Sequence, residues 1–200
     1  MTSLIGAIAG FVMLFLSQTT ANTAQQLEEA NKAFTFAGEA INPRAVSSLL
    51  TWESDNLPGP IAIDLAGSHH ANRYYGKFER KDDGSVYIDL SKPDSTRAEA
   101  ETGGYFSYKH LGVLPGGIHV LETAQSGGGS GVFEDLLLIK FATDFEYQDD
   151  GTKRDRVMMV RIGEISLGDR SSSTVEIRGD TIRIGGDPRS GKSARVLRFK

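Results

Sequence analysis

Four consecutive aliphatic residues, Leu136 to Ile139, constrain the fold more than any other part of the sequence. Successive side chains of a strand point to opposite faces, so this segment is apolar on both faces. Such a strand has to be covered on both sides to keep its side chains away from water. The run therefore predicts a central strand inside a two-layer core.

The chain from Ile61 onward consists of short apolar segments separated by turn residues, a pattern that is typical of strands. None of the separations holds a helical stretch long enough for a parallel crossover, so the strands should be mainly antiparallel. We therefore expect an all-β fold, a mainly antiparallel β-sandwich or barrel. The candidate strands are 61–66, 72–81, 85–91, 104–112, 117–124, 132–142, 154–167, 174–178, 181–185 and 194–199.

The only helical signals lie in residues 25–57, where we expect one or two short N-terminal helices. Residues 25–32 are polar and rich in alanine and glutamate. Asn42 followed by Pro43 is typical of a helix start, with asparagine as the N-cap and proline at the first helical position. The segment Leu57 to Pro60 then ends the helical region, because it holds two prolines and a glycine.

Turn residues predict the strand pairing of the hairpin around Gly179-Asp180, which suits a two-residue turn. Such a turn sets Ile177 opposite Ile182 on one face. On the other face it sets Glu176 opposite Arg183. Because apolar then meets apolar and acid meets base, this register is self-consistent.

A three-residue loop, Asp82 to Gly84, suits an earlier hairpin better than a two-residue turn. The longer loop sets Phe78 opposite Ile88 and Lys77 opposite Asp89, whereas the shorter one would set apolar side chains against charged ones. Glycine supplies the left-handed position that such a loop requires.

Residues 105–123 predict a third hairpin, which turns at Pro115 to Gly117. We expect Val113 opposite Ile118, on an aliphatic face that ends with Lys109 opposite Glu122.

The other face of this third hairpin collects aromatic side chains and two histidines, and Tyr108, His110 and His119 are candidate ligand-binding residues. The two histidines would be diagonal neighbours, with about 7 Å between their Cβ atoms. Zinc requires a third protein ligand, and spacing assigns none, so we assign no metal and no cofactor.

An apolar run, Leu4 to Leu16, predicts a signal peptide over residues 1–24. Its thirteen residues are too few for a membrane-spanning helix, which needs about 20. We expect a single β-rich domain over residues 25–200, with no stable membrane anchor once the signal is removed. Since the chain has no cysteine, a secreted or bacterial periplasmic location is favoured over a disulfide-stapled secretion.

Charge is divided unevenly along the chain. Residues 25–151 hold 10 basic and 20 acidic side chains, and residues 152–200 hold 12 basic and 6 acidic ones. A basic face could attract nucleic acid or an acidic envelope polymer. We favour the simpler interpretation, in which the two regions pack together and neutralise each other, and we expect no nucleic-acid partner.

Residues 186–193 match the phosphate-binding pattern G-x-x-x-x-G-K-S. A phosphate-binding loop needs a helix directly after it, whose free N–H groups hold the phosphates. Val196, Leu197 and Phe199 instead predict a terminal strand. We therefore expect a glycine-rich turn between the last two strands.

Two loops have the composition of binding loops. The first is the serine-glycine segment 126–131, where glycine allows close approach to a partner, and its candidates are Ser126, Gly128, Ser130 and Phe133. The second is the segment 64–75, which is dense in polar and aromatic side chains, and its candidates are His69, His70, Arg73, Tyr74 and Tyr75.

No complete catalytic set is present in the sequence, so a non-enzymatic function is favoured. We expect an exported binding domain that recognises an unknown protein or glycan of the cell envelope through its surface loops. One alternative is a metal-dependent or other hydrolase that uses the His110 and His119 face. Another alternative is a structural envelope component, suggested by the division of charge.

Overall fold

The computed structural model describes residues 22–50, 61–70, 77–90 and 104–200, without the side chains of residues 68–70. Within these residues the fold is mostly antiparallel β-structure with a few short helices, as the sequence predicts. A large sheet has the strand order β3-β9-β8-β7-β6-β5-β4. Its strands are β3 (Ala62–Asp64), β4 (Glu79–Arg80), β5 (Val86–Asp89), β6 (Tyr105–Leu114), β7 (Ile118–Ser126), β8 (Phe133–Tyr147) and β9 (Lys153–Asp169).

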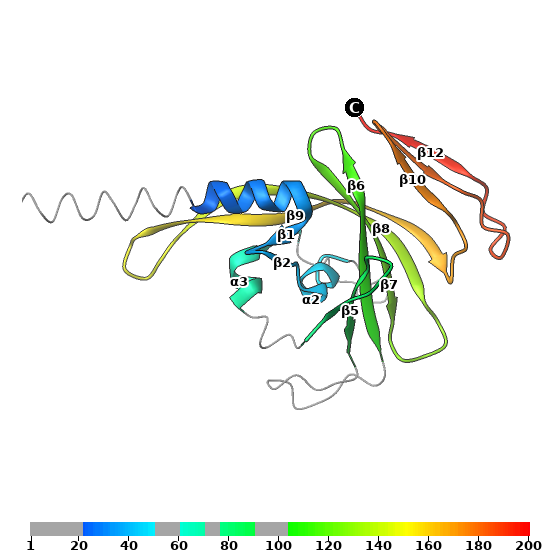
Figure 1. Ribbon diagram of the computed structural model, residues 1–200, viewed down its shortest axis with the longest axis horizontal. Coiled ribbons are helices and arrows are strands. Elements are labelled where there is room, and N and C mark those ends of the chain that lie inside the picture. Colours follow the sequence, from blue (N-terminus) through cyan, green and yellow to red (C-terminus); the bar gives the residue numbers. More distant parts are fainter. Residues whose placement is uncertain (1–21, 51–60, 71–76, 91–103) are drawn as a thin grey trace, which may run out of the picture.

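Two smaller sheets complete the β-structure. One is the three-stranded sheet of β10 (Val175–Arg178), β11 (Thr181–Ile184) and β12 (Arg195–Arg198), which packs on one face of the large sheet. The other is the pair β1 (Thr35–Phe36) and β2 (Glu39–Ala40). Figure 1 shows the three-stranded sheet, in orange to red, beside the upper end of β6 and at the opposite end of the molecule from the turn between β8 and β9.

Strand β8 is central, and both of its faces are covered. Leu137 and Ile139 lie in a core with the N-terminal helices, whereas Leu136 and Leu138 lie in a second core with the three-stranded sheet. All four side chains are buried. The prediction from the aliphatic run is therefore confirmed.

The helical prediction for the N-terminal region is confirmed in the described residues. Residues 22–33 are helical and lie along the β8–β9 hairpin (Figure 1). Helix α2 (Pro43–Ser47) begins after Asn42, whose side chain accepts a hydrogen bond from the backbone N–H of Arg44 at 2.8 Å. The predicted end of the helical region at 57–60 lies outside the described residues.

A third helix, α3 (Leu65–His70), corrects the predicted strand 61–66, which ends at Asp64. The Asp64 carboxylate accepts a hydrogen bond from the backbone N–H of Ala66 at 2.9 Å and so caps the helix. Of the predicted strand 72–81, the described residues contain only the short strand β4.

The hairpin registers test the turn chemistry directly. Ile177 pairs with Ile182 and Glu176 with Arg183, as the two-residue turn requires. The earlier hairpin also has its predicted register, closed by the three-residue loop with Gly84 at φ 85°.

The register predicted for the hairpin of β6 and β7 is correct at its open end and wrong near its turn. Lys109 pairs with Glu122 as expected, but Leu114 instead of Val113 pairs with Ile118. A β-bulge between His110 and Gly112 shifts the register by one residue. The bulge buries Leu114 in the second core and leaves Val113 43% exposed.

Among the described helices, none combines the length and the apolar character needed to cross a membrane.

Candidate functional site

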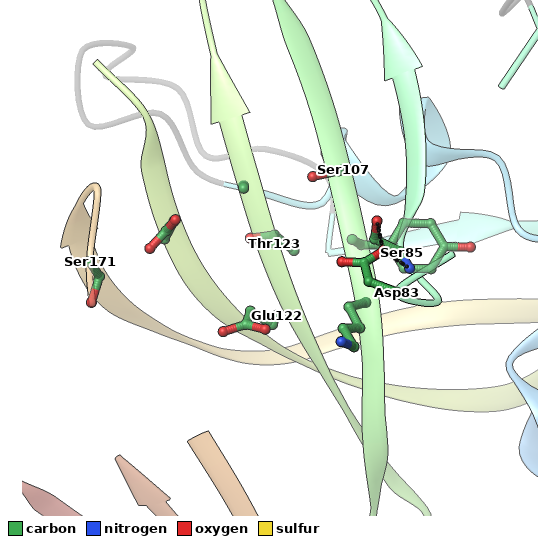
Figure 2. A pocket seen from close by; sticks show the side chains of 10 residues that line it. Asp83, Ser85, Ser107, Glu122, Thr123 and Ser171 are labelled. Carbon is green, nitrogen blue, oxygen red and sulfur yellow. Dashed lines mark hydrogen bonds between the residues drawn. The ribbon is translucent and has the colours of Figure 1, made fainter. Parts of the chain in front are cut away.

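The large sheet is only partly covered by the three-stranded sheet, and a hollow of about 260 Å³ lies on the uncovered part. We call it the polar hollow. Its walls come from the β4–β5 turn, from β6, β7 and β8, and from the segment that joins β9 to β10 (Figure 2). The lining residues are Asp83, Ser85, Ser107, Tyr108, Lys109, Glu122, Thr123, Ala124, Glu134 and Ser171.

Strand periodicity explains why polar side chains gather on this face. Glu122 is two residues from Val120 along β7, so both point to the same face of the sheet. Val120 lies in the core beneath the three-stranded sheet, whereas Glu122 lies beyond that cover and lines the hollow. The same face is therefore aliphatic where it is covered and charged where it is open.

The carboxyl groups of the polar hollow differ in their proton affinity. Burial raises the pKa of Glu122, although the nearby Lys109 ammonium opposes the shift. Burial also raises the pKa of Glu134, and the charge of Glu122 adds to the effect. Hydrogen bonds from the hydroxyl and N–H groups of Ser85 lower the pKa of Asp83. Glu122 and Glu134 are thus half-buried carboxyl groups that line the hollow, and neither forms an ion pair with a cation of the described residues.

Two tyrosines extend the site across the sheet. Tyr87 lies directly opposite Ser107, and Tyr105 is two residues from Ser107, so both rings share the face of the hollow. The rings stack with centroids 5.5 Å apart and an interplanar angle of 28°. The Lys81 Nζ lies 4.7 Å from the centroid of the Tyr87 ring and covers part of it. A half-buried aromatic platform therefore adjoins the polar groups.

The predicted histidine face lies on the opposite side of the sheet, and the structure brings its members together. His110 Nε2 and His119 Nδ1 are 3.2 Å apart, within hydrogen-bonding distance. The rings pack against Phe34, which directly follows the first helix, and the His119 ring also packs against Phe141. The histidines therefore belong to an aromatic core that joins helix and sheet.

Burial decides the chemistry of this pair. His119 is completely buried, and its Nε2 has no hydrogen-bond partner among the described residues. Burial, with a smaller contribution from His110, lowers the pKa of His119 to about 4. Tyr108 is also buried, and its hydroxyl donates a 2.6 Å hydrogen bond to the carbonyl oxygen of Ile41. Within the described part of the chain, no three metal-ligating side chains come together.

The serine-glycine loop joins β7 to β8, as a hairpin loop rather than a linker between domains. Ser126 is buried and accepts a 3.4 Å hydrogen bond from the backbone N–H of Gly128, whereas Ser130 is exposed. Phe133 is 51% exposed, on the face of β8 opposite to Glu134. The loop lies next to the polar hollow, because the strand ends that flank it carry Ala124 and Glu134.

The second predicted binding loop is only partly described. His69 and His70 lie in α3 rather than in an extended loop. Arg73, Tyr74 and Tyr75 lie outside the described residues. Asp64, which ends β3 and caps α3, forms a 2.9 Å ion pair with Arg154 of β9.

Sequence reasoning missed the polar hollow, although it did pair Lys109 with Glu122. The available signal was the change from aliphatic to charged residues along a single face of the hairpin. What the pattern alone did not supply was the point where the three-stranded sheet stops covering that face.

Comparison of the chain with known families, with curated proteins and with solved structures finds no match, so the case for function rests on this geometry.

Proposed function

We propose that the protein is an exported binding domain that holds a glycan on the open face of its large sheet. The observation that carries the proposal is the polar hollow itself, where hydroxyl, carboxyl and ammonium groups converge beside stacked tyrosines. Ligand sites are typically concave and fix their ligands with a few convergent polar groups. At about 260 Å³ the hollow suits one ring-sized group, with the rest of the ligand along the sheet.

The chemistry of the lining favours a glycan over a protein partner. Sugar hydroxyls both donate and accept hydrogen bonds, and the hollow offers carboxylate acceptors at Glu122 and Glu134 and a donor at Lys109. A tyrosine ring presents an apolar face with a polar edge, which matches the C–H face of a sugar. The centre of a protein interface is instead depleted of charged side chains.

The glycine-rich loop and the apolar N-terminal run support other parts of the proposal. The loop lies beside the hollow, where backbone N–H groups of glycines are accessible to a long ligand. The apolar run Leu4 to Leu16 has the length of a signal-peptide core, which supports export to a place where envelope glycans occur.

Binding to immobilised glycans tests the proposal. The full chain is passed over a panel of neutral and acidic glycans, and the retained ones are measured in solution by calorimetry. We expect retention of at least one glycan. Glu122→Gln and Tyr105→Ala should each weaken its binding about tenfold, because each removes a polar or stacking contact.

Glu28→Gln is the matched control, since Glu28 is exposed on the first helix, which packs on the other side of the large sheet from the hollow. This variant should bind as the unmodified protein does. Failure to retain any glycan, or equal weakening by Glu28→Gln, would contradict the proposal. Release of cleaved sugar from a retained glycan would instead assign a hydrolase.

A further inference from the structure

Residues 152–200 carry an excess of basic side chains, and packing against the acidic region neutralises only some of them. On β9 the basic side chains are neutralised by carboxylates. Arg154 pairs with Asp64 and Glu146, and Arg156 pairs with Asp144 and Glu146. Packing against the acidic region therefore neutralises the long hairpin, as predicted.

The three-stranded sheet behaves differently. Arg183 and Arg198 have neither an ion pair nor a hydrogen bond in the part of the chain that the structure describes, and both are exposed. Arg178 is 66% exposed and pairs at 2.9 Å with Glu176, which lies on the same face. In the described residues, Arg183 and Arg198 are thus two unpaired cations beside the paired Arg178.

Strand register places the three arginines together. Thr181 pairs with Arg178 on one side and with Arg198 on the other, so the two arginines flank it on a common face. Neighbouring strands lie about 4.8 Å apart, which separates these two Cα atoms by about 10 Å. Arg183 is two residues along the middle strand, on the same face. The Asp180 carboxylate accepts a 2.8 Å hydrogen bond from the Thr181 hydroxyl and lies beside this group. Three arginines against Asp180 and Glu176 leave an excess of positive charge on the face.

The two faces of the three-stranded sheet have opposite roles. Its inner face supplies Ile182 and Ile184 to the second core. Its outer face carries Glu176, Arg178, Thr181, Arg183, Val196 and Arg198. We propose that this outer face, centred on Arg178, Arg183 and Arg198, is a docking surface for an acidic polysaccharide.

Charge complementarity argues for a polyanion, and the composition of the face selects the polysaccharide. Single-stranded nucleic acid is held by stacking on aromatic side chains, and this face has no aromatic residue. Membrane surfaces are bound by aromatic or aliphatic anchors together with basic residues, and Val196 is the one large apolar side chain here. Guanidinium groups on a flat sheet face can instead pair with several carboxylates or sulfates of an extended polymer.

The net charge of −4 does not prevent such binding. At physiological ionic strength, charges more than about 8 Å away are largely screened. A polymer lying on the sheet therefore responds mainly to the arginines that it contacts. The affinity should fall steeply as salt is added, because binding displaces counterions from the polymer.

The test measures binding of the full chain to heparin and to polygalacturonate, which are sulfated and carboxylated polysaccharides, over a series of salt concentrations. The triple variant Arg178→Gln/Arg183→Gln/Arg198→Gln should bind both at least tenfold more weakly, with a shallower dependence on salt. Thermal melting verifies that the variant is folded. A neutral glycan retained by the polar hollow should bind this triple variant as tightly as it binds the unmodified protein, which separates the two sites.

The matched control is the triple variant Lys32→Gln/Lys77→Gln/Arg80→Gln, which removes the same charge from exposed positions elsewhere. It should bind within twofold of the unmodified protein. Equal weakening by both triple variants would overturn the proposal, as would failure of the unmodified protein to bind either polysaccharide. Tighter binding to duplex DNA or to phosphatidylglycerol vesicles would also overturn it, since the partner would then belong to another class.

Discussion

His110 and His119 share one hydrogen bond between their rings. It joins His110 Nε2 to His119 Nδ1 at 3.2 Å, and the tautomers of the two rings decide which nitrogen donates. Burial lowers the pKa of both rings and so favours their neutral forms. The Nε2 of His119 is buried and has no partner in the described residues.

Acid should destabilise the protein through His119. In the unfolded chain the imidazole pKa is about 6.5, whereas in the folded protein it is lowered to about 4. Between these values the unfolded state binds more protons, so stability rises with pH across this window and is lost as pH falls through it. From pH 7 to pH 4.5 the loss from this residue should be about 2 kcal/mol.

Urea unfolding at pH 7 and pH 4.5 measures this loss. His119→Asn keeps a donor near His110 without a titrating group, so its loss over the same interval should be smaller by about that amount. The double variant His69→Asn/His70→Asn retains the buried pair and should lose as much as the unmodified protein. Equal losses in His119→Asn and the unmodified protein would contradict the assignment.

At the scale of the element, turn chemistry and alternation predicted most strands to within a few residues. The strand register of two hairpins could be predicted from their turns, Gly179-Asp180 and the loop that ends at Gly84, because each turn type demands a fixed strand pairing. Helix α3 and the bulge before Gly112 were not predictable in this way. Asp64 begins a helix by capping it, and the bulge follows from burial of Leu114 against another sheet. The bulge depends on a tertiary contact that local patterns do not contain, whereas Asp64 as an N-cap is a local signal that the strand prediction overlooked.

The turn at residues 186–193 has a structural role, although its sequence matches a phosphate-binding pattern. It leads into strand β12, not into a helix, which confirms the predicted glycine-rich turn. The buried Asp187 carboxylate accepts hydrogen bonds from the hydroxyls of Ser172 and Ser190, each 2.7 Å long. These bonds lower the pKa of Asp187 and tie the turn to the segment after β9. Lys192 Nζ donates to the carbonyl oxygen of Leu167 at 2.8 Å, in a structural role.

Removing this carboxylate should loosen the three-stranded sheet. Asp187→Ala leaves two hydroxyls and a backbone N–H without their acceptor, and such losses are costly in buried positions. We expect the melting temperature to fall by several degrees. Ser193→Ala is the control, because Ser193 is exposed, and its melting temperature should stay within about 1 °C of the unmodified protein. A similar melting temperature for both variants would show that Asp187 does not hold the turn.

At the scale of the whole molecule, one sheet separates two cores and also joins them. Strand β8 contributes alternate side chains to the core under the helices and to the core under the three-stranded sheet. The polar hollow and the basic face lie on the side of the second core, and the histidine pair lies in the first. A substitution that destabilises either core should therefore lower the stability of the structure on both sides of the sheet.

This coupling predicts a single unfolding transition. Leu137→Ala and Leu138→Ala open cavities in different cores, and each should lower the free energy of unfolding by about 3 kcal/mol. Hydrogen exchange with increasing urea compares peptides from residues 22–34 with peptides from residues 175–198. In both variants the two regions should lose protection at the same urea concentration, because neither core has a sheet to pack on once β8 is lost. If Leu138→Ala exposed residues 175–198 while residues 22–34 stayed protected, the three-stranded sheet would be an independent unit, and the large sheet would not couple the two cores.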